Sequence, residues 1–78
     1  MIEYKKPNGV SGYELGIHLN GNGGIKLLDF SDRDSAVEFM CSARDGGCVF
    51  VVDDGLGDVE FFIEPHGIVA FSLNEQFE

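Results

Sequence analysis

Several residue types are scarce in this chain, and each scarcity excludes a class of protein. It has no tryptophan, two prolines and two cysteines among 78 residues, which is too few cysteines for a disulfide-stabilised scaffold. No window approaches the roughly 18–20 apolar residues of a membrane-spanning helix, and the N-terminus lacks the apolar stretch of a signal peptide. We therefore expect a cytoplasmic protein whose thiols, Cys41 and Cys48, are reduced and partly buried.

Basic residues are few in comparison with acidic residues. Five Lys and Arg stand against 14 Asp and Glu, which gives a formal net charge of −9. The first thirty residues are balanced and no Lys or Arg follows Arg44, so the whole surplus lies in residues 31–78. Such a surface repels nucleic acid and anionic membranes and attracts basic proteins. Direct nucleic-acid binding is excluded, because no basic patch exists to supply it.

The apolar content indicates a folded domain and not an acidic tail. Apolar residues make up 44% of the chain and aromatic residues 12%, including seven Phe. Disordered acidic segments have few of either. We predict a single small acidic domain over residues 1–78, with one core that buries about 60% of the unfolded surface.

The first half of the chain reads as two strands joined by a tight turn. Residues 13–19 alternate between apolar and polar side chains, which predicts a half-buried strand. Asn and Gly fill residues 20–24 and favour a hairpin connection to a return strand over residues 25–30. Residues 2–4 are a candidate for a short edge strand ahead of them.

A helix is predicted to follow, with Ser31 as its N-cap and two glycines, Gly46 and Gly47, as its end. Its apolar face consists of Ala36, Val37, Phe39, Met40 and Ala43. Helical spacing gathers three carboxylates on the opposite side: Asp34, Glu38 and Asp45.

Three more strands complete the prediction. Residues 48–52 are apolar on both faces, which predicts a central strand. Residues 53–58 predict a turn. Residues 59–64 alternate between apolar and polar side chains and predict another strand. In that strand we expect Val59, Phe61 and Ile63 to point inward and Glu60, Phe62 and Glu64 outward. Residues 68–73 form the last strand and residues 74–78 fray. The fold class is α+β: a mainly antiparallel sheet of about five strands with one helix packed on one face, in the order ββαβββ.

No motif predicts catalysis, a metal or a cofactor. The glycine-rich residues 21–24 precede a strand, whereas a phosphate-binding loop must open a helix. The acids Asp53, Asp54 and Asp58 do not form a calcium-binding loop, which has acids at alternate positions and a terminal Glu. The possible zinc ligands are His18, His66, Cys41 and Cys48, and no two of them have the short spacing of a preformed zinc site. A domain this small also has little depth for a water-shielded active site.

Acidic side chains around an aromatic anchor remain as the candidate functional feature. An exposed aromatic residue with charged neighbours suits a protein interface. The predicted partner-binding residues are first Asp53, Asp54, Asp58, Glu60, Phe62 and Glu64, and second Asp34, Glu38 and Asp45. The alternative is that Phe62 packs beneath a second element and that the acids only maintain solubility.

Residues 28–39, with the sequence Leu-Asp-Phe-Ser-Asp-Arg-Asp-Ser-Ala-Val-Glu-Phe, run from a strand into an acid-capped helix. The chain resembles the small acidic inhibitors of phages and mobile elements, particularly the anti-CRISPR proteins. The resemblance rests on this junction, on the length and acidic balance of the chain, and on its strand–strand–helix–strand order. The resemblance implies a stoichiometric, non-catalytic inhibitor in the cytoplasm of a bacterial host. It would dock on the basic surface that a CRISPR effector complex uses for DNA, or block assembly of that complex.

Two other functions stay open. An immunity or antitoxin-like protein that covers a basic toxin nuclease would use the same acidic surface. A small phage structural or accessory protein would instead self-assemble through an exposed sheet edge. For an inhibitor, we expect a monomer or a weak homodimer.

Overall fold

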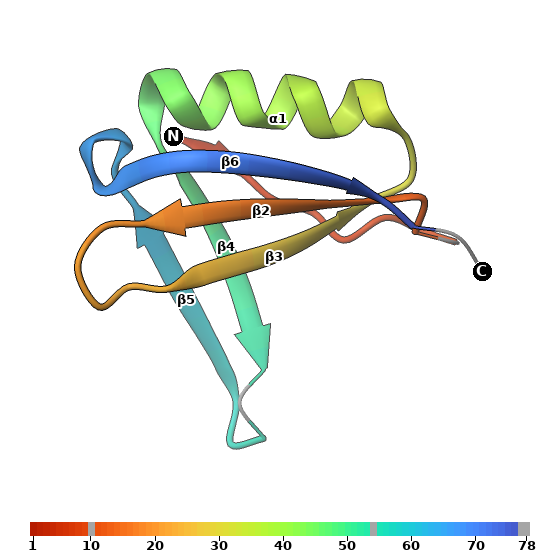
Figure 1. The fold of residues 1–78 in the computed structure, drawn as a ribbon. Coiled ribbons are helices and arrows are strands. Elements are labelled where there is room, and N and C mark those ends of the chain that lie inside the picture. The colour runs from red at the N-terminus through yellow and green to blue at the C-terminus, as the bar shows by residue number, and fades with distance from the viewer. Residues whose placement is uncertain (10, 54, 77–78) are drawn as a thin grey trace.

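The computed structural model of the chain describes residues 1–9, 11–53 and 55–76. Within these ranges it contains one α-helix, α1 (Arg33–Gly46), and six strands (Figure 1). The α+β class and the position of the helix agree with the prediction. The single sheet was wrong, because the strands divide into two sheets of three.

The first sheet has the order β3-β2-β6 and is antiparallel throughout. Its strands are β2 (Tyr13–Leu19), β3 (Ile25–Phe30) and β6 (Ile68–Glu75). The last strand is longer than predicted: β6 pairs with β2 as far as Glu75, and the Gln76 N–H donates to the Gly12 carbonyl at 2.9 Å. The predicted fraying is therefore wrong for residues 74–76, while residues 77–78 lie outside the described residues.

The second sheet has the order β1-β4-β5 and is mixed. β4 (Cys48–Asp53) and β5 (Asp58–Ile63) form an antiparallel hairpin, and β1 (Ile2–Glu3) lies parallel to β4. The predicted edge strand at the N-terminus therefore exists, but it pairs with the second half of the chain. This pairing joins the N-terminus to the second half of the chain and makes β4 the central strand of its sheet.

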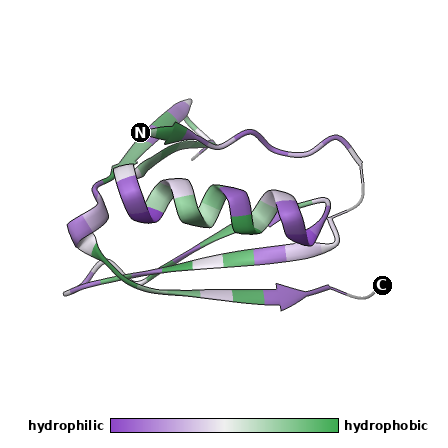
Figure 2. Cartoon of the chain, turned by 90° about the horizontal axis from the view of Figure 1, so that it is seen from above, coloured by the Kyte–Doolittle hydropathy of each residue, from purple (hydrophilic) through white to green (hydrophobic). Residues whose placement is uncertain are grey.

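Helix α1 packs against β2, β3 and β6 of the first sheet and against β1 of the second. Seen from above, the β3–β2–β6 sheet runs along one side of it, and β4, β5 and the N-terminal segment lie on the other (Figure 2). The β4–β5 hairpin crosses behind β2 and β3 at a steep angle (Figure 1). The buried core draws on both sheets and the helix: Leu15, Ile17, Leu28, Phe30, Ala36, Phe39, Ala43, Cys48, Phe50 and Ile63.

The start of α1 differs by one residue from the prediction, because Asp32 and not Ser31 is the N-cap. Its Oδ1 accepts a hydrogen bond of 2.7 Å from the Ser35 N–H. This bond favours the charged carboxylate and lowers the pKa of Asp32. The apolar face is confirmed: Ala36, Phe39 and Ala43 are buried.

Tyr4 fastens the N-terminal segment to the first sheet. Its hydroxyl donates to the Asp29 carbonyl at 2.7 Å and accepts from the Asp29 N–H at 3.1 Å. Its ring packs edge-on against Phe30 and Phe39, with centroids 5.4 and 5.9 Å away. Burial raises the pKa of the Tyr4 hydroxyl, so it stays a neutral donor at physiological pH.

Replacing Tyr4 with phenylalanine is expected to lower the free energy of unfolding by about 1–3 kcal/mol, because the Asp29 backbone loses both partners. Urea denaturation followed by circular dichroism measures the change. Tyr13→Phe is the matched control, since its hydroxyl has no hydrogen bond with a described residue and should give a change below about 0.5 kcal/mol. Equal effects of the two substitutions would mean that the Tyr4 hydroxyl contributes no specific stability.

Candidate protein-binding surface on the β4–β5 hairpin

The β4–β5 hairpin is anchored at one end and projects from the body at the other (Figure 1). Cys48, Phe50 and Ile63 at its base are buried in the core. Toward the turn, Val51 is 52% exposed and Val52 44% exposed. β4 is the central strand of its sheet, as predicted. The expected burial of both faces was wrong for this half of β4, because the hairpin extends beyond the elements that could cover it.

The outer face of the hairpin combines apolar and acidic side chains. The register places Val49 opposite Phe62 and Val51 opposite Glu60. Since side chains alternate along a strand, these four residues share one face, which points away from the core. Phe62 is 65% exposed, so the alternative in which it packs beneath another element of this chain is wrong.

Carboxylates surround this apolar strip. Glu3 on β1 pairs in register with Val49, which places it at one side of the face. Glu60 is exposed on β5, and Glu64 follows the strand end, where one of its oxygens lies 3.2 Å from the His66 Nε2. Asp54, also predicted to bind a partner, lies outside the described residues.

The end of the hairpin carries two like charges that face each other. Asp53 and Asp58 are register partners, and both are exposed. The Asp53 Oδ1 accepts a 2.8 Å hydrogen bond from the Gly55 N–H, so this carboxylate helps to shape the turn. Like charges directly opposite in a sheet are destabilising. Asp58 therefore lowers the stability of the hairpin without a compensating contact to a described residue.

The acids on the helix form a separate cluster. Asp34, Glu38 and Asp45 are all exposed on α1, as predicted. The Asp45 Oδ1 lies 3.2 Å from the Arg44 Nε, which partly neutralises it. Helix α1 and the turn of the hairpin lie at opposite ends of the molecule (Figure 1). The carboxylates at the turn of the hairpin and those on the helix therefore belong to separate parts of the surface.

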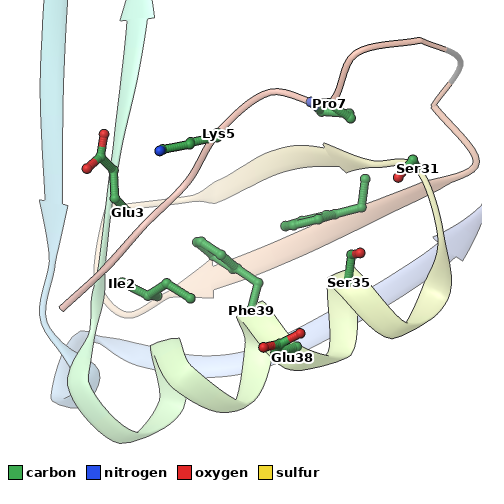
Figure 3. A pocket seen from close by; sticks show the side chains of 9 residues that line it. Ile2, Glu3, Lys5, Pro7, Ser31, Ser35, Glu38 and Phe39 are labelled. Carbon is green, nitrogen blue, oxygen red and sulfur yellow. The ribbon is translucent and has the colours of Figure 1, made fainter.

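A groove of about 300 Å³ separates the N-terminal segment from the first half of α1 (Figure 3). Its floor is formed by Phe30 and Phe39, and its rim carries charges of both signs and two hydroxyls, from Glu3, Lys5, Glu38, Ser31 and Ser35. These groups include no nucleophile–base pair. Because its rim charges are of both signs, the groove lacks the one-sided field of the hairpin.

A hydroxyl–imidazole pair on the first sheet is absent from the sequence prediction. The His18 Nε2 lies 2.9 Å from the Ser72 Oγ. Gly16 leaves the space for this bond, because a Cβ there would collide with the Ser72 hydroxyl. The two residues lie on neighbouring strands and are far apart in sequence, so no local spacing could have indicated the pair. It lies on an uncovered sheet face and not in a water-shielded cleft, and we assign it to joining β2 and β6.

Other chemistry has little basis in the described residues. They contain no group of three or more His, Cys, Asp or Glu side chains that could hold a metal. Cys48 is fully buried, and this burial raises the pKa of its thiol, which disfavours the nucleophilic thiolate. Within the same part of the chain, no helix has the length and apolar character needed to cross a bilayer.

Comparison of the chain with protein-family models, with curated proteins and with solved structures finds no match. The assignment of a function therefore depends on the geometry and charge of the hairpin.

Proposed function

We propose that this protein is a non-catalytic inhibitor that binds a basic, nucleic-acid-binding surface of another protein through its β4–β5 hairpin. The like-charge pair Asp53–Asp58 is the observation that carries this assignment. Two facing carboxylates oppose folding of the hairpin, and a basic partner would turn them into a source of binding energy. Asp58 breaks this rule without a compensating contact to a described residue, and such residues are typical of functional sites.

The chemistry of the partner follows from the charge. Channels that hold DNA or RNA are lined with Lys and Arg, because neutralising phosphates dominates their affinity. A rigid hairpin can place carboxylates where those phosphates would lie. Phe62, 65% exposed at the centre of the outer face, would add an apolar contact that nucleic acid does not make.

A CRISPR effector complex is the first target we propose, which makes the chain an anti-CRISPR protein acting in the cytoplasm of a bacterial host. A basic toxin nuclease is the second, because the same acidic hairpin would cover its active site. Self-assembly is less favoured, since every copy carries the same charge of −9.

A competition experiment tests the proposed function. Tagged protein is first used to capture partners from a lysate that contains CRISPR effectors, at low and at high salt. Each captured complex is then purified and mixed with labelled target DNA. We expect the protein to displace the DNA at a stoichiometric concentration, and the inhibition to weaken as salt rises.

The outcomes separate the targets. Displacement from an effector complex supports the anti-CRISPR function, and displacement from a toxin nuclease, with rescue of cells that express it, supports the immunity function. A discrete oligomer in solution together with no displacement from either target would contradict the proposed function and favour self-assembly.

A further inference from the structure

β5 is an open edge of the second sheet. The strand order β1-β4-β5 leaves one side of β5 without a neighbouring strand among the described residues. Its six residues contain no Lys and no Pro, and its pairing with β4 is regular from Asp58 to Ile63. Proteins normally protect exposed edges with such residues, with bulges or with very short strands, because the free backbone groups can pair with another chain.

The other edge strands have these protections. β1 is only two residues long. β3 contains Lys26. The pairing of β6 with β2 is irregular: the register passes from His18–Ala70 to Leu19–Ile68 and skips Val69. β5 is therefore the edge best suited to accept an added strand.

The side chains of β5 differ between its two faces. On the inner face, Ile63 is buried and Phe61 stacks on Phe50 with ring centroids 5.4 Å apart. The Lys26 Nζ lies 5.0 Å from the centre of the Phe61 ring, so this face is already occupied near its base. On the outer face, Asp58, Glu60 and Phe62 are exposed. Selectivity for an added strand would therefore come from the outer face.

The charge of this edge selects between possible occupants. A second copy of the chain would bring its own Asp58 and Glu60 against the same residues, and like charges on facing strands are destabilising. A strand with Lys or Arg at alternate positions would instead place its cations beside these carboxylates. The two acids thus prevent self-pairing and favour a basic partner.

We propose that β5 accepts an added strand from an extended basic segment of the partner protein, with Lys or Arg at alternate positions on its outer face. This inference rests on the proposed function, since it specifies how the hairpin binds. Backbone hydrogen bonds along the edge would supply affinity, and the alternating acids with Phe62 would set the register.

A synthetic octapeptide of alternating lysine and valine is the probe. Its control is the same peptide N-methylated at every amide, which keeps the four lysine ammonium groups and removes the backbone donors. We expect the unmethylated peptide to bind at least about tenfold more tightly. Hydrogen exchange measured by NMR should show about tenfold slower exchange at every second amide of β5, since alternate amides of a strand face the same edge.

Two variants keep the test selective. Asp58→Asn with Glu60→Gln should weaken binding of the unmethylated peptide about tenfold or more, because the backbone edge remains while its charges are lost. Asp34→Asn with Glu38→Gln on α1 removes the same charge elsewhere and should change binding less than about threefold.

Three results would overturn the inference: equal binding of both peptides, protection on β6 in place of β5, or no binding of the unmethylated peptide. The first of these would leave charge attraction alone as the means of binding. In every case the proposed function is tested separately, by whether the intact protein displaces DNA from its target.

Discussion

Gly47→Ala is expected to lower the free energy of unfolding by about 3 kcal/mol. Gly47 has φ 80° and ψ 179°, a combination that is essentially restricted to glycine and costs other residues about 1–3 kcal/mol. A Cβ at this position would also collide with the Ile63 carbonyl oxygen, and relieving such overpacking adds about 1–3 kcal/mol. At about 4–8 °C per kcal/mol for a domain of this size, Tm should fall by roughly 12–24 °C.

Three elements meet at this glycine, so little can move to relieve the collision. Its N–H donates to the Ala43 carbonyl of α1 at 2.8 Å, and its own carbonyl accepts from the Ile2 N–H of β1 at 3.1 Å. The colliding oxygen belongs to the end of β5. Thermal unfolding followed by circular dichroism measures the effect.

Gly46→Ala is the matched control for this prediction. Gly46 is the last residue of α1 and has no positive φ, and a Cβ there would come only within 4.0 Å of the Met1 nitrogen. Alanine should therefore be neutral or should stabilise the protein by up to about 1 kcal/mol. If Gly47→Ala proved as mild as Gly46→Ala, the junction would have a different backbone conformation from the one described.

Reversing Asp58 and Glu60 to lysine is expected to weaken binding to the captured partner about 100-fold. Close charge pairs at an interface contribute at least about 1.5 kcal/mol each, so losing two removes about 3 kcal/mol. The salt dependence of the remaining binding should also be flatter. The hairpin should still fold, since Asp58→Lys replaces a like-charge pair with Asp53 by an opposite-charge pair.

Asp34→Lys with Glu38→Lys makes the same change of net charge on α1. If the hairpin is the binding surface, the affinity of this variant for the partner should fall less than about tenfold, because only the long-range attraction is weakened. Isothermal titration calorimetry at two salt concentrations measures both variants. Equal losses would mean that net charge and not the hairpin drives binding, and a larger loss for the helix variant would move the site to α1.

Local patterns predicted the elements of this fold better than their arrangement. The alternation in residues 13–19 and the apolar spacing from Ala36 to Ala43 each depend on one period, and both features are present in the structure. The second sheet includes the pairing of Ile2 with Cys48, and nothing local to either residue indicates that contact. The N-cap was displaced by one residue because Ser31 and Asp32 are both good caps, and only the backbone geometry selects between them.

The candidate site was also predicted only in part, because local patterns indicate the elements better than their arrangement. Alternation in residues 59–64 correctly placed Phe62 outward, because the period of a strand assigns faces directly. It could not show that Val51 and Val52 are exposed, since an apolar run looks the same in a buried strand and in a projecting one. To predict that Asp53 faces Asp58, one must know the register of the hairpin. To predict the His18–Ser72 hydrogen bond, one must know that β2 pairs with β6.

The parallel pairing of β1 with β4 has a consequence for the order of assembly. The Ile2 and Tyr4 N–H groups donate to the carbonyls of Gly47 and Val49, residues that leave the ribosome only after the whole helix. The first residues made must therefore wait, unpaired, while β2, β3 and α1 associate through nearer contacts. Contacts between segments distant in sequence form slowly. We expect the N-terminus to take its final position only after β4, which is part of the hairpin with the proposed binding surface, has formed.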